Sequence, residues 1–137
     1  MRMGWMVLAL PLALPLALAA CVDREAPTPT GAEDFASYCS GCHGAGGKGD
    51  GPAAAGLDRR PADLTRISAR NGGVFPGTRV MAKIWSYSGG PGAETPMPSF
   101  APLLDGDLVG YDGGDGIKSP TPVRLVQVAE YLKTLQE

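Results

Sequence analysis

The segment Cys39-Ser40-Gly41-Cys42-His43 places two thiols and one imidazole within a single turn of chain. This Cys-x-x-Cys-His spacing is the one at which haem c is attached to protein. The thiols add across the two vinyl groups of the porphyrin, and the imidazole that follows reaches the iron. His43 is the only histidine of the chain, so no other residue could supply an imidazole ligand. The motif therefore predicts one covalent haem c on Cys39 and Cys42, with His43 as an iron ligand.

Two other kinds of site use Cys-x-x-Cys. A thioredoxin-like redox pair is expected beside a βαβ pattern in a cytosolic protein, and neither feature is visible here. A structural zinc site needs a second pair of ligands, and no histidine or cysteine follows His43. Both alternatives lack support elsewhere in the sequence.

Residues 1–20 have the pattern of an export signal. Arg2 precedes an apolar run from Trp5 to Ala20, which two prolines interrupt and which is too short for a good membrane-spanning helix. The residues Leu18-Ala19-Ala20-Cys21 resemble the lipobox of bacterial lipoproteins, in which the cysteine becomes a lipid-bearing N-terminus. The alternative is ordinary cleavage a few residues earlier, which would leave Cys21 as a free thiol. With Cys21 lipidated and the other cysteines on haem, none remains for a disulfide.

The rest of the chain divides into a tether and one domain. Residues 21–30 combine proline and threonine with few apolar groups, so we expect a flexible, semi-extended segment. Residues 31–137 are enough for one small domain around the haem. The formal net charge of the whole chain is only −2, and nothing in its distribution indicates binding to nucleic acid.

Apolar spacing predicts helices and no strands. We expect helices from about Ala32 to Cys39, from Thr78 to Tyr87, and from Pro122 onward, so the predicted class is all-α. The apolar residues of the last helix recur at intervals of three or four: Val123, Val126, Ala129, Leu132 and Leu135. Residues 105–118 are rich in glycine and aspartate and are predicted to form a solvated loop or a partner contact. Calcium binding there is a weaker alternative, because the spacing does not match an EF-hand.

Residues 31–135 resemble a class I c-type cytochrome. The first helix of that family often reads Gly-x3-Phe-x3-Cys-x-x-Cys-His, and Gly31, Phe35 and Cys39 stand in this register. The last helix of the family carries an aromatic residue that packs across the first, and the segment around Tyr131 is similar to it. The resemblance implies a small cytochrome c fold in which the N- and C-terminal helices cross near Gly31, Phe35 and Tyr131.

The resemblance also implies the second iron ligand. Met97 lies in Thr95-Pro96-Met97-Pro98-Ser99-Phe100, which resembles the methionine-ligand loop of the family. Met81, within a predicted helix, is a weaker candidate, and a vacant or water-bound position is a third possibility. Arg59, Arg60 and Arg70 are further candidates, for contact with the haem propionates.

Together these features predict a one-electron carrier rather than an enzyme. A His43/Met97-ligated iron has no open position for a substrate. The expected location is the periplasmic side of a bacterial membrane, with the lipid on Cys21 as anchor. Expected partners are a dehydrogenase, an oxidase or a reductase. Two alternatives remain: a haem subunit of a larger oxidoreductase, and a haem protein that binds gas at an open sixth position.

Overall fold

The structure is a computed structural model that describes residues 27–86 and 97–137. The predicted signal peptide, Cys21 and most of the predicted tether lie outside these ranges, as does the Thr95-Pro96 part of the methionine loop. Residues 27–30 are exposed and non-helical, and they lead into the first helix. None of the described helices is long and apolar enough to cross a membrane.

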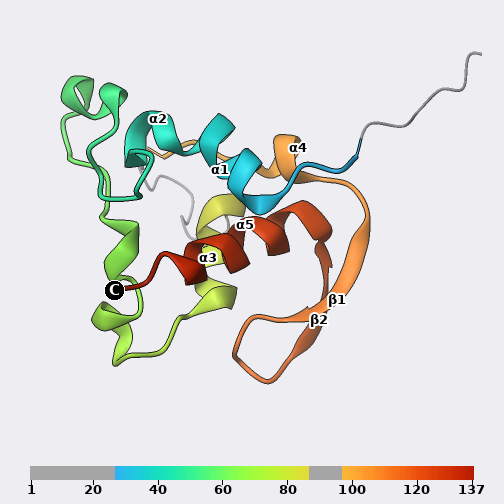
Figure 1. Ribbon diagram of the computed structural model, residues 1–137. Coiled ribbons are helices and arrows are strands. Elements are labelled where there is room, and N and C mark those ends of the chain that lie inside the picture. The colour runs from blue at the N-terminus through green and yellow to red at the C-terminus, as the bar shows by residue number, and fades with distance from the viewer. Residues whose placement is uncertain (1–26, 87–96) are drawn as a thin grey trace, which may run out of the picture.

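Five α-helices, three short 3-10 turns and a two-stranded ribbon make up the described residues (Figure 1). In chain order they are α1 (Gly31–Tyr38), α2 (Ser40–His43), η1 (Pro52–Gly56), η2 (Leu64–Arg66), η3 (Ala69–Asn71), α3 (Gly77–Trp85), α4 (Ala101–Leu104), β1 (Leu108–Asp112), β2 (Lys118–Pro122) and α5 (Val123–Thr134). The predicted helices near 32–39, 78–87 and 122 onward are confirmed within a residue or two of each end that the structure describes.

The first and last helices cross closely, as the resemblance implied (Figure 1). The backbone of α5 approaches Gly31 so nearly that an added Cβ would overlap the Gln127 carbonyl, and only glycine permits this contact. The rings of Phe35 and Tyr131 pack beside the crossing, with their centroids 5.3 Å apart. A capping box begins α1, because the Thr30 and Glu33 side chains each satisfy the other's backbone amide.

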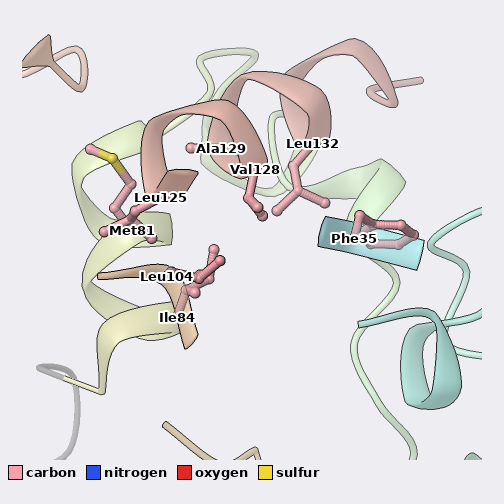
Figure 2. Packing of buried hydrophobic residues seen from close by; sticks show 8 residues of the cluster. All are labelled: Phe35, Met81, Ile84, Leu104, Leu125, Val128, Ala129 and Leu132. Atoms are coloured by element: carbon pink, nitrogen blue, oxygen red, sulfur yellow. The ribbon is translucent and has the colours of Figure 1, made fainter. Parts of the chain in front are cut away.

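The hydrophobic core lies between α1, α3, α4 and α5 (Figure 2). Its buried members are Phe35, Met81, Ile84, Leu104, Leu125, Val128, Ala129 and Leu132. Of the predicted apolar residues of the last helix, Ala129 and Leu132 are buried, and Val126 and Leu135 are half-buried and pack against the core. Val123 is half-buried as well. Apolar residues on two neighbouring faces of α5 recur at intervals of three or four. The face that contains Leu125 and Val128 packs against α1 and α3 and is the one that is buried. Met81 is a core residue.

The all-α class is not confirmed, because residues predicted as a loop form an antiparallel ribbon. β1 pairs with β2 from Leu108 opposite Pro122 to Asp112 opposite Lys118. Each strand has only five residues, contains glycine or proline and is largely exposed, so the sequence shows no clear alternation. In the turn, one oxygen of Asp112 accepts three backbone amides. In residues 27–86 and 97–137, no group of three or more acidic, histidine or cysteine side chains could hold a metal ion.

Candidate haem site

The Cys-x-x-Cys-His motif begins at Cys39, directly after α1, and continues through the whole of α2, and a glycine-rich loop holds it in place. The Gly49 amide donates to the His43 carbonyl at 2.8 Å, and the Gly51 amide donates to the Cys42 carbonyl at 3.1 Å. Gly51 lies directly against α2, where a Cβ would come within 2.6 Å of the Ser40 carbonyl oxygen. The glycines after the motif therefore bring backbone close to it, as their position in the sequence suggested.

A backbone carbonyl sets the orientation of the His43 ring. The Nδ1 atom lies 2.9 Å from the carbonyl oxygen of Ala62. Because a carbonyl oxygen only accepts hydrogen bonds, Nδ1 carries the proton and donates it, and the lone pair is on Nε2. A hydrogen bond of this kind fixes both the tautomer and the direction of a metal-binding imidazole. No side chain marks Ala62 in the sequence, so the motif alone could not reveal this contact.

Cys39, Cys42, His43 and Met97 all line one cavity of about 560 Å³. Met97 is separated from the motif by 54 positions in the chain, so the fold brings together residues that the sequence only suggested would meet. The rest of the lining is Tyr38, Leu57, Arg59, Arg60, Pro61, Ala62, Lys83, Pro98 and Phe100. Met81 does not line this cavity, because its side chain belongs to the core.

No disulfide joins the two motif cysteines. The pKa of Cys39 is raised to about 11, first by burial and then by electrostatic interaction with Asp34 and the nearby Cys42. Cys39 is therefore protonated at neutral pH.

Of the three arginines predicted to contact the haem propionates, two line the cavity and one does not. Arg59 and Arg60 line the cavity. The Arg60 guanidinium also donates to the Gly49 carbonyl at 3.2 Å, which ties the cavity wall to the glycine loop. Arg70 instead donates to the Asp63 carbonyl at 2.7 Å and does not line the cavity. Lys83 lines the cavity from α3, and sequence reasoning had not singled it out.

Crossed terminal helices beside a cavity that contains a Cys-x-x-Cys-His motif are the features of a class I c-type cytochrome. The family model described as cytochrome c oxidase, cbb3-type, subunit III matches residues 26–109, which is more than half of the chain. The chain belongs to this family, and it is a c-type cytochrome with a role in haem-based electron transfer. No curated protein and no solved structure matches the chain.

The lining of the cavity fits haem c. Two thiols, an imidazole with its lone pair on Nε2 and a thioether are the donor types that haem c uses. Apolar side chains from Leu57, Pro61 and Phe100 suit the faces of a porphyrin, while two arginines suit its carboxylates.

Proposed function

We propose that this chain carries one electron at a time on a single covalent haem c, with thioether bonds to Cys39 and Cys42. His43 and Met97 are the axial ligands in this proposal. The observation that carries it is the shared cavity, which these four side chains line from distant parts of the chain. The haem iron supplies the one-electron chemistry, and the protein supplies everything around it.

The chain's own residues would bind the haem, orient the side chains that hold its iron, and exclude water from it. The Ala62 carbonyl holds the His43 ring with Nε2 available to the iron. Pro98 stiffens the backbone beside Met97, which favours a persistent thioether contact. With His43 and Met97 both holding the iron, no position on it would be open to a substrate, and the thioether would raise the reduction potential. These roles describe an electron carrier, with no catalytic residue among them.

Substitution of Met97 tests the ligand assignment. We expect Met97→Ala to lose the weak far-red absorption band of ferric iron bound to a thioether. The reduction potential should fall by an amount on the order of 0.1 V, because sulfur ligation favours ferrous iron. Optical spectra of the ferric and ferrous protein, together with a redox titration, measure both effects.

Met81→Leu is the matched control, because it removes the other described methionine sulfur while nearly preserving its volume in the core. This variant should keep the band and the potential. Carbon monoxide should change the absorption spectrum of reduced Met97→Ala at once and should leave the spectrum of the reduced wild type unchanged. A wild-type protein without the band that takes up carbon monoxide immediately would instead be a gas-binding haem protein.

The partner that we propose is an oxidase, with this chain either as its haem subunit or as a tethered donor to it. The family description, subunit III of a cbb3-type oxidase, supports this choice over a dehydrogenase or another reductase. We also propose that lipid on Cys21 anchors the domain to the periplasmic side of a bacterial membrane. The lipobox-like residues before Cys21 support the anchor.

Cell fractionation tests the anchor. We expect Cys21→Ser, produced in a bacterial host with its leader, to move from the membrane fraction to the soluble periplasmic fraction because it cannot carry the lipid. Its visible spectrum should match that of the wild type. Retention of Cys21→Ser in the membrane fraction without any oxidase present would contradict the lipid anchor.

A further inference from the structure

The two edges of the β1–β2 ribbon differ in their capacity to accept another strand. Proline has no amide proton, so the pairs of Pro122 with Leu108 and of Pro120 with Gly110 cannot be hydrogen-bonded pairs. The ladder bonds therefore belong to the alternate pairs. The Val123 amide donates to the Asp107 carbonyl at 2.8 Å, so the pair next to Leu108 and Pro122 is hydrogen-bonded. This agrees with ladder bonds at every second pair.

The consequence is one blocked edge and one open edge. At Pro120 and Pro122 the backbone nitrogen that faces away from β1 has no proton, so the outer edge of β2 lacks two donors. On the outer edge of β1, the amides and carbonyls of Leu108 and Gly110 point away from β2. Outside the ladder itself, the backbone of neither residue makes a hydrogen bond in the part of the chain that the structure describes. The open edge here is thus confined to one strand.

The open edge is both apolar and acidic. Leu108 is 62% exposed and Val109 is 42% exposed. Residues 105–122 contain four aspartates and only one lysine. Asp115 accepts bonds from the Ile117 amide and the Thr78 hydroxyl, which lower the pKa of its carboxyl and keep it ionised. The edge therefore suits an occupant with positive charge.

A cleft beside the ribbon also suits a positively charged group. It has a volume of about 370 Å³ and lies between α3 and the strands, with Trp85, Tyr111, Asp105 and Asp115 in its lining. Aromatic faces next to carboxylates favour a lysine or arginine side chain.

We infer that the open edge of β1 docks an extended, lysine- or arginine-bearing segment of a partner protein by strand addition. A second copy of this chain is a poor occupant, because it would bring another ribbon with four aspartates and one lysine against an edge with the same excess of negative charge. The ribbon lies across the molecule from α2 (Figure 1), and none of its residues lines the haem cavity. A partner held there leaves the cavity accessible, and the inference adds an attachment surface to the proposed electron carrier.

A peptide probe tests the edge directly on the haem-loaded protein. The probe is a blocked, fluorescent hexapeptide that alternates lysine and valine, measured by fluorescence anisotropy and by hydrogen exchange of the protein. We expect binding together with slower exchange at the amides of Leu108 and Gly110. A peptide with glutamate in place of lysine, and one with every backbone amide N-methylated, should each bind about tenfold more weakly or not at all.

Gly110→Pro removes an outward amide and leaves the ladder pairs intact, so it should abolish binding. Asp107→Lys, which leaves the backbone unchanged, should weaken it about tenfold. The matched controls Val74→Ser and Asp58→Lys alter an exposed apolar residue and an exposed aspartate outside the ribbon, and should have no effect.

Three results would overturn the inference: no binding at millimolar peptide, equal binding of the N-methylated peptide, or unchanged binding by Gly110→Pro. A dimer in light scattering that Gly110→Pro dissociates would assign the edge to a second copy instead. The haem spectrum reports separately on the Met97 ligand, so failure here is distinguishable from failure of the proposed function.

Discussion

Asp34 is a carboxylate with only 2% of its surface exposed, and Arg124 meets it from the far end of the chain. The Arg124 Nε atom donates to one Asp34 oxygen at 3.0 Å, Nη2 donates to the other, and Nη1 donates to the Leu103 carbonyl at 2.7 Å. This bidentate contact joins α1 to α5 beside the crossing. A buried charge is tolerated only when its hydrogen bonds are complete, as they are here.

Removal of one partner of the Asp34–Arg124 pair should therefore lower the free energy of unfolding much more than removal of both. We expect Arg124→Met to lower the free energy of unfolding by about 3 kcal/mol, near the low end for buried pairs because the guanidinium retains some contact with water. The double variant Asp34→Leu/Arg124→Met should recover much of this loss. Denaturant titration of the haem-loaded proteins measures both.

The exposed Lys48–Glu137 pair provides the comparison, because its N–O distance of 3.0 Å is short while both side chains are more than half exposed. Lys48→Met should be close to neutral. Additive losses from the Asp34 and Arg124 substitutions would show that the pair is not coupled.

The ribbon is joined to α5 by one aromatic side chain. Tyr111 packs against the core, and its hydroxyl donates to the Glu130 carboxylate. The pKa of Tyr111 is raised to about 12, first by burial and then by the hydrogen bond to Glu130 and its negative charge. The neutral phenol is therefore the form that the folded protein stabilises.

Stability should consequently depend on alkaline pH. Between about pH 10, the ordinary pKa of a tyrosine, and about pH 12, the unfolded chain loses the phenol proton before the folded chain does. The contribution of Tyr111 is complete below this range and is lost as the pH rises through it. Tyr111→Phe should cost about 1 kcal/mol at neutral pH and should show a shallower alkaline loss than the wild type. Denaturant titrations at several pH values test this, and parallel curves would contradict it.

At the scale of the whole molecule, the haem cavity is large beside a small core. Eight buried hydrophobic residues form the core within the described ranges, and the cavity beside them measures about 560 Å³. Many of its lining side chains are only half-buried. A small domain with so little buried surface depends on a bound apolar group to complete it.

Loss of the haem should therefore unfold the domain. We expect Cys39→Ser/Cys42→Ser, which cannot form thioether bonds, to have a free energy of unfolding near zero, against about 5–15 kcal/mol for an ordinary domain. Its far-ultraviolet circular dichroism should show reduced helix and no cooperative thermal transition. Cys21→Ser, which leaves both haem thiols in place, is the control. A cooperative transition in the haem-free variant would contradict a structural role for the haem.

Much of the architecture could be predicted because it depends on neighbours in the sequence. The spacing of apolar residues predicted the helices near Phe35, Ile84 and Leu132, and the resemblance to class I c-type cytochromes implied the helix crossing at Gly31. The ribbon escaped prediction because its strands are short and exposed. The strands are held by pairing with each other and by the packing of Tyr111 against the core, and neither strand has a clear alternation of apolar and polar residues.

The sequence by itself determined the haem motif and the helical segments, since each depends on residue types at short spacing, and the resemblance to class I c-type cytochromes made Met97 a candidate ligand. Only the tertiary structure decided which stripe of α5 is buried, that Arg124 pairs with Asp34, and that the Ala62 carbonyl orients His43. These features join residues as many as 90 positions apart. The last also involves a backbone atom that every residue type possesses. No local pattern encodes such contacts, because they exist only after the chain has closed around its core.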